Sequence, residues 1–126
     1  MRAAAVLAGL LLARGALACG YCVEDKIAAT YDHAVIVRAA DRRHEVVFLS
    51  LEGALARTQE RAVARAVEST AGVDPGTVRV SLENGAVSFA FDPSRGSLDS
   101  IVGGVRSKLA AKGAGVSVLR VLGERL

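Results

Sequence analysis

The chain has 126 residues, a formal net charge of +3 and a hydrophobic fraction of 52%. A chain of this length suits one small domain. Three Phe, two Tyr and no Trp are present, and they do not alternate with basic residues. The composition therefore gives no support for a nucleic-acid-binding protein.

Residues 1–18 are predicted to be a secretory signal peptide. Arg2 supplies a positive start, an apolar run follows, and Ala16-Leu17-Ala18 fits the small-x-small cleavage pattern. The run is shorter than the roughly 20 residues that cross a bilayer. We therefore expect a periplasmic or secreted protein with no membrane span after cleavage, and one that is nearly neutral because Arg2 and Arg14 leave with the signal. Lipidation of Cys19, which would anchor the protein, is the alternative.

An extra helix is predicted after the signal, over about residues 23–43. Ile27, Tyr31 and Val35 recur at every fourth position, which suits an amphipathic helix. The competing interpretation makes residues 34–37 a short strand. We favour the helix because the turn that such a strand needs has no Gly or Pro.

From residue 45 onward, strands and helices alternate. Strands are predicted over 45–51, 77–83, 86–92 and 116–122, and helices over 55–71 and from the N-cap Ser97 to about 112. Asn84-Gly85 marks a hairpin. This order predicts an α+β, ferredoxin-like βαββαβ fold: two helices on a four-stranded antiparallel sheet, with the extra N-terminal helix before it. Alternating polarity in the hairpin strands predicts one buried sheet face and one that is wet or covered by something polar.

The sequence divides into four parts on this basis. They are a signal peptide (1–18), a cysteine-bearing helical segment (19–44), the ferredoxin-like domain (45–122) and a C-terminal tail (123–126).

A family resemblance is carried by two stretches of the sequence. They are Val73-Asp74-Pro75-Gly76-Thr77-Val78-Arg79-Val80-Ser81-Leu82-Glu83-Asn84-Gly85 and Phe91-Asp92-Pro93-Ser94-Arg95-Gly96-Ser97-Leu98-Asp99. Residues 45–122 resemble the heavy-metal-associated domain of periplasmic mercury-binding proteins and copper chaperones, and this resemblance implies the same fold and metal handling. The family holds its ion in a Gly-Met-x-Cys-x-x-Cys loop between the first strand and first helix. Here the two cysteine positions fall on Ala56 and Gln59, neither of which is a thiolate ligand.

The only two cysteines form Cys19-Gly20-Tyr21-Cys22, beside the expected cleavage site. Two thiolates at this spacing bind soft ions such as copper or mercury, or provide half of a zinc site. His33 and His44 are additional candidate ligands. An unbroken helix would separate His33 from Cys22 by about 16 Å, which argues against His33.

Two other roles stay open for the cysteine pair. A Cys19–Cys22 disulfide would leave an interaction or structural protein of the cell envelope, because an exported thiol pair tends to oxidise. A thiol-redox protein is the third option, although the motif does not follow a buried strand as thioredoxin-like sites do. We predict a non-enzymatic binding protein whose partner is a metal ion or an envelope protein.

Overall fold

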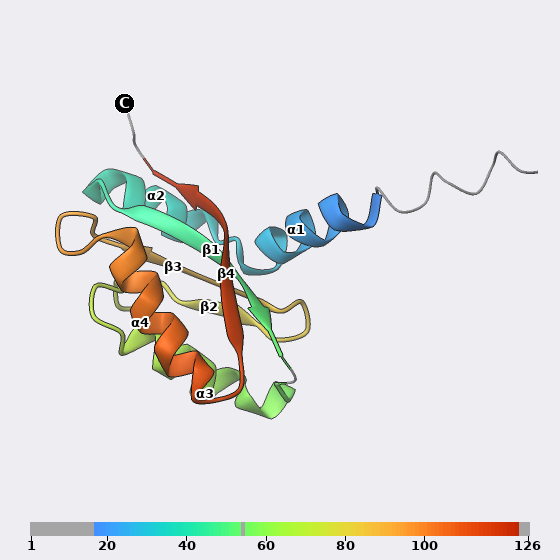
Figure 1. The fold of residues 1–126 in the computed structure, drawn as a ribbon. Helices are drawn as coiled ribbons and strands as arrows, with labels where there is room; N and C mark the ends of the chain where they lie inside the picture. The colour runs from blue at the N-terminus through green and yellow to red at the C-terminus, as the bar shows by residue number, and fades with distance from the viewer. Residues whose placement is uncertain (1–16, 54, 124–126) are drawn as a thin grey trace, which may run out of the picture.

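The computed structural model describes residues 17–53 and 55–123, with side chains from residue 23 onward. Residues 1–16 of the expected signal peptide and 124–126 of the tail lie outside the described residues. The elements are α1 (Leu17–Thr30), α2 (His33–Arg42), β1 (Glu45–Glu52), the short 3-10 helix η1 (Arg57–Gln59), α3 (Glu60–Glu68), β2 (Arg79–Ser81), β3 (Ala86–Phe91), α4 (Leu98–Ala110) and β4 (Gly115–Leu122) (Figure 1). No helix in this described part is long and apolar enough to cross a membrane.

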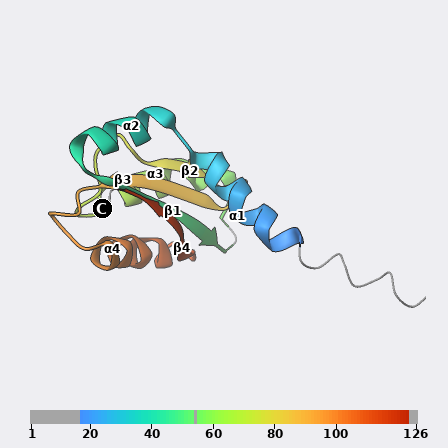
Figure 2. The ribbon, with the colours of Figure 1, turned by 90° about the horizontal axis from the view of Figure 1, so that it is seen from above.

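The four strands form one antiparallel sheet in the order β2-β3-β1-β4. Helices α3 and α4 lie on one face of it, and the view from above shows α1 and α2 on the other (Figure 2). This arrangement confirms the predicted ferredoxin-like fold, with additional helical structure at the N-terminal side. Strand β1 is central, because it pairs with both β3 and β4.

The main core lies between the sheet and the α3–α4 layer. It is built from alternate residues of β1 and β3 packed against the apolar sides of the two helices: Val47, Leu49, Val87, Phe89, Phe91, Val63, Val67, Val105 and Leu109. All of these side chains are fully buried. Each contributes on the order of 1.5–3 kcal/mol by leaving water, so this layer provides most of the apolar stabilisation of the fold.

A second, smaller core fills the opposite face of the sheet. Val46 and Phe48 of β1 and Ala90 of β3 pack there against three helical residues, Ile27, Val35 and Ala39. All six residues of β3 are consequently buried. The prediction of a wet or polar-covered second face was wrong, because α1 and α2 cover it with apolar side chains. The small residues of β3 on this face leave room for them.

The predicted single helix over 23–43 was also wrong, because the chain breaks at Tyr31 and Asp32 into α1 and α2. Asp32 has an extended backbone and caps α2: its Oδ1 accepts hydrogen bonds from the amides of Ala34 (2.9 Å) and Val35 (3.4 Å). An aspartate at this position satisfies helix amides that otherwise lack a partner. The alternative strand over 34–37 is equally absent, since those residues lie in α2.

The hairpin forms where Asn84-Gly85 predicts it, but its turn spans Leu82–Gly85 because Ser81 pairs with Ala86. Gly85 has φ +62°, and a Cβ there would lie 2.9 Å from the carbonyl oxygen of Leu51. A side chain would strain that backbone and clash with the carbonyl group, so the position favours glycine.

The capping residue also ties α2 to the sheet, and this link gives a pH-dependent prediction. The Arg79 Nε donates to Asp32 Oδ2 at 3.0 Å. This bond, together with those from the Val35 and Ala34 amides, lowers the pKa of Asp32 against the opposing effect of desolvation. A lowered folded-state pKa stabilises the protein above the unfolded value of about 3.9, and the gain is lost as the pH falls through the folded value.

We expect Asp32→Asn to lower the melting temperature at pH 5–7, because asparagine keeps the cap but loses the charge that Arg79 pairs with. The deficit should begin to shrink below about pH 4, where the unfolded chain binds a proton at Asp32, and should disappear as the pH falls through the lowered folded pKa. Thermal melts from pH 3 to pH 7 measure it. The control is Asp41→Asn, an exposed residue of α2 without an ion pair in the described part of the chain. Equal deficits at pH 3 and pH 7 would contradict this account.

Candidate functional site

The backbone of the cysteine motif is helical, because α1 begins at Leu17 and continues to Thr30. Cys19 and Cys22 are therefore three positions apart in a regular helix. Positions three apart are neighbours on a helix surface, with about 5–6 Å between their Cβ atoms. The expected cleavage after Ala18 would fall in the first turn of this helix and leave the pair at the helix N-terminus.

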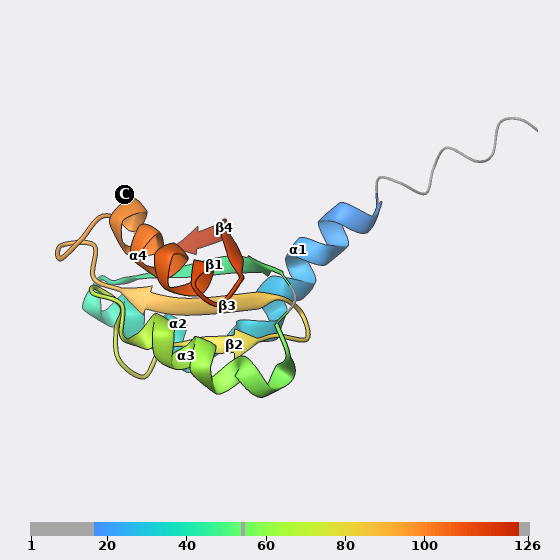
Figure 3. The same ribbon diagram turned by 60° about the horizontal axis from the view of Figure 1, so that its bottom comes forward.

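Polar contacts place the described part of α1 against the sheet. Lys26 Nζ donates to Ser50 Oγ of β1 at 2.6 Å, and Arg120 of β4 pairs with Glu24 at 2.9 Å. Ser50 lies near the carboxyl end of β1, so this part of α1 is close to the loop that follows that strand. Figures 1 and 3 agree that α1 extends from the end of the sheet where η1 and the β2–β3 turn lie.

The loop between β1 and η1 holds no cysteine or histidine. At its end, the Ala56 amide donates to the Gln59 side-chain oxygen at 3.0 Å. Ala56 and Gln59 occupy the positions where the family resemblance would require thiolates. Gln59 therefore closes the short η1 turn and provides no metal ligand there.

His33 lies at the first turn of α2, exposed, with Nδ1 3.4 Å from the Tyr31 hydroxyl. The helix break makes an approach to the cysteines conceivable, but α1 stays helical up to Thr30. The eight helical steps from Cys22 to Thr30 span about 12 Å. The structure therefore does not bring His33 together with the cysteine pair.

His44 lies between α2 and β1, where two aspartates face its ring. Its Nδ1 is 2.6 Å from Asp74 Oδ2, and its Nε2 is 3.6 Å from Asp92 Oδ2. Asp92 also accepts bonds from the hydroxyl and amide of Ser94. These bonds lower the pKa of Asp92, and the neighbouring charges of His44 and Arg95 act in the same direction. His44 thus joins three chain segments: the start of β1, the loop before β2 and the loop after β3.

The sequence did not lead us to this cluster, because Asp74 and Asp92 stood out only as parts of the two stretches that carry the family resemblance. A usable signal was present. The two Asp-Pro pairs flank the hairpin turn at Asn84-Gly85, one on each side, so antiparallel pairing brings them to the same end of the sheet. The bridge between Val73 and Phe91 shows this pairing.

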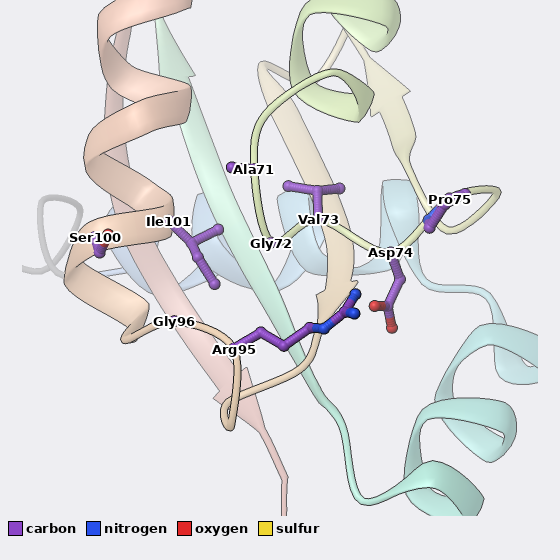
Figure 4. A pocket seen from close by; sticks show the side chains of 9 residues that line it. All are labelled: Ala71, Gly72, Val73, Asp74, Pro75, Arg95, Gly96, Ser100 and Ile101. Carbon is purple, nitrogen blue, oxygen red and sulfur yellow. The ribbon is translucent and has the colours of Figure 1, made fainter.

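A small hollow of about 210 Å³ adjoins Asp74, between the α3–β2 loop and the start of α4. In Figure 4 the Arg95 side chain extends across it toward Asp74, and Ile101 and Val73 provide apolar lining. The hollow is smaller than the roughly 300–1,000 Å³ typical of drug-sized ligand sites. Among the residues that the structure describes, neither this hollow nor any other place groups three or more His, Cys, Asp or Glu side chains suitably for a metal ion.

Comparison with known proteins gives structural matches only. No protein-family model matches the chain, and no curated protein sequence matches it. A copper binding domain from HMA7, a P-type ATPase, superposes with a TM-score of 0.50 at 17% identity, covering 61% of this chain and 96% of that domain.

Two further solved structures match less closely in shape. Oxidized MerP from Ralstonia metallidurans CH34 is 25% identical, with a TM-score of 0.49, over 60% of this chain and 96% of MerP. The metallochaperone CopZ is 28% identical, with a TM-score of 0.46, over 57% of this chain and 98% of CopZ. The HMA7 match supports the conclusion that the chain has the ferredoxin-like fold seen in heavy-metal-associated domains.

We expect His44→Leu to destabilise the protein by about 1–3 kcal/mol, because it leaves the Asp74 carboxylate without its partner. The matched control is His33→Leu at an exposed position, which should change the free energy of unfolding by no more than about 0.5 kcal/mol. Urea denaturation measures both. Equal effects of the two substitutions would argue against a structural role for His44.

Proposed function

We propose that this protein binds a soft metal ion, Cu(I) or Hg(II), through Cys19 and Cys22. The observation that carries the proposal is that α1 includes both residues, three positions apart in one helix. Neighbouring thiolates suit soft ions that accept few ligands. Zn²⁺ is the weaker choice, because it requires four ligands and the described residues offer no cluster to complete such a site.

The position of the pair in the fold supports the same proposal. The Lys26–Ser50 bond holds α1 beside the carboxyl end of β1, and Cys22 lies about 6 Å further along the helix axis than Lys26. The family resemblance places its metal loop after that strand. The HMA7 domain that shares the fold is a copper binding domain. The proposed site would thus be carried by α1 at the same end of the domain.

The ligand set is proposed to be small. His44 has both ring nitrogens facing aspartates, and α1 separates His33 from the pair. Both histidines are therefore left out of the site. Cleavage after Ala18 would make Cys19 the first residue, and its α-amino group would provide a third ligand. Two thiolates and one amine form a low-coordinate site, which suits an ion that is carried and passed on without chemistry.

Export belongs to the same proposal. The positive start, the apolar run and the Ala-x-Ala ending of residues 1–18 support a signal peptide and a periplasmic or secreted protein. A lipid on Cys19 is the alternative form of the mature end. That lipid would be joined to the Cys19 sulfur as a thioether and would leave Cys22 as the one thiolate of the pair, so this form would not provide the two-thiolate site.

A second candidate is an interaction or structural protein of the envelope, with Cys19 and Cys22 joined as a disulfide. It is favoured by the lack of a third cysteine or histidine ligand near the pair among the described residues. Such a bond would close a very short loop and add little to stability.

Cu(I) titration of the reduced protein against a competing chelator tests the proposal. We expect one ion per chain, and a loss of affinity of at least about tenfold in Cys22→Ser, because one of two strong ligands is removed. His33→Leu serves as a control and should bind as the wild type does. Absence of Cu(I) and Hg(II) uptake by the fully reduced wild type would refute the proposal.

A gain-of-function variant provides a positive control. Ala56→Cys combined with Gln59→Cys, in a chain carrying Cys19→Ser and Cys22→Ser, restores thiols to the loop after β1. We expect this variant to bind Cu(I), because the fold would then present the thiol pair of the family that it resembles. If this variant binds Cu(I) and the wild type does not, the fold can hold the ion in the loop after β1, and the proposed site at Cys19 and Cys22 is wrong.

A further inference from the structure

Few apolar side chains hold α1 to the sheet over residues 23–30, the part of this helix whose side chains the structure describes. Ile27 is its only buried apolar side chain, and Val23 is partly buried beside it. The other contacts are the Lys26–Ser50 bond, the exposed Glu24–Arg120 ion pair, and the bond from Ser88 Oγ to the Thr30 carbonyl oxygen at 3.1 Å. Exposed ion pairs contribute little to stability, so Ile27 carries most of the attachment.

One contact of α1 opposes docking. Thr30 is 4% exposed, and its Oγ1 is buried without a hydrogen-bond partner in the described part of the chain. Burying an unpaired hydroxyl costs free energy comparable to what one apolar side chain gains. When α1 leaves the sheet, this hydroxyl regains water. The free energy gained by burying Ile27 is therefore largely offset by the cost of burying the unpaired Thr30 hydroxyl.

Helix α2 is attached more firmly and does not depend on α1. Val35 and Ala39 are buried, and Ile36 packs partly against the same cluster. Asp32 both caps α2 and bonds to Arg79 of β2. Because the cap precedes α2 and follows α1, α2 keeps its first-turn partners when α1 moves.

The two residues between the helices, Tyr31 and Asp32, are the only non-helical positions between α1 and α2. Tyr31 is half exposed, and the far end of α1 points away from the rest of the molecule (Figure 3). A rotation of the backbone at Tyr31 would therefore free α1 by breaking its Lys26–Ser50 and Ser88–Thr30 bonds, while the pairing of the strands and the docking of α2 are kept.

We propose that α1 is a detachable arm, which leaves the sheet as a unit about Tyr31 while α2 stays docked. Local openings of this kind are expected where few apolar contacts hold an element. The consequence for the cysteines rests on the proposed function: the undocked arm would carry Cys19 and Cys22 away from the domain, toward an acceptor of the metal ion.

Native-state hydrogen exchange of the purified full chain, in low concentrations of urea, tests the arm. The amides of residues 27–30 should exchange roughly tenfold or more faster than those of 37–40 in α2 and 47–49 in β1. Their exchange should depend weakly on urea, because little surface opens. One common rate and urea dependence for α1 and β1 would overturn the proposal, as would joint exchange of α1 and α2.

Three variants sharpen the test. Thr30→Val should slow exchange of the α1 amides by roughly tenfold, because it removes the unpaired hydroxyl at constant shape. Ile27→Ala should accelerate amide exchange in α1 alone. Val35→Ala, a matched truncation on α2, should accelerate amide exchange in α2 and β1 but leave the exchange rates of α1 unchanged. If Val35→Ala accelerates α1 as much as Ile27→Ala does, the two helices open together and the arm does not exist.

These measurements use the metal-free protein and so separate the two proposals. A chain that fails to bind Cu(I) can still show the arm, and a chain that binds Cu(I) can lack it.

Discussion

Burial of β1 on both faces is the constraint on which the rest of the structure depends. Seven of the eight strand residues, Glu45–Leu51, are buried, and the strand pairs with β3 on one side and β4 on the other. Val47 and Leu49 face α3 and α4, while Val46 and Phe48 face α1 and α2. A strand that is apolar on both faces requires two covering layers. The N-terminal helices provide the second layer, with α2 as its firmly attached part.

The second layer is smaller and more polar than the first, and this difference explains its construction. It is closed by few apolar residues and by hydrogen bonds such as those of Ser50 and Ser88. Asp32 is central to this second layer, because its carboxylate caps α2 directly after the break between the helices and also pairs with Arg79. His44 has a similar role at the other end of α2, where it joins that helix to the loops around the β2–β3 hairpin.

The ferredoxin-like unit could be predicted because its signals are local. Asn84-Gly85, the N-cap Ser97 and the apolar run of β1 each indicate their element without reference to the rest of the chain. The break at Asp32 could not be predicted by periodicity, because Ile27 and Val35 keep a helical spacing across it. The new helix α2 starts at a capping interaction of Asp32, which is supported by Arg79, a residue distant in the sequence.

The candidate site likewise combines features that the local sequence indicates with features that depend on tertiary contacts. The spacing of Cys19 and Cys22 is a local sequence pattern. The helix that includes them was predicted only in part, because the predicted helix began at about residue 23. The roles of His33 and His44 depended on tertiary contacts: Asp74 and Asp92 come from loops that only the folded hairpin brings beside His44. Sequence alone could name these histidines as candidates but could not assign them.

Native mass spectrometry of the protein purified from the cells that produce it tests the central claim most directly, because one spectrum reports the cleavage site, any lipid, the thiol state and the bound ion. The account predicts a chain beginning at Cys19, without a disulfide, that carries one copper or mercury ion. A chain two hydrogens lighter than the thiol form, without metal and unable to take up Cu(I) after reduction, would contradict it.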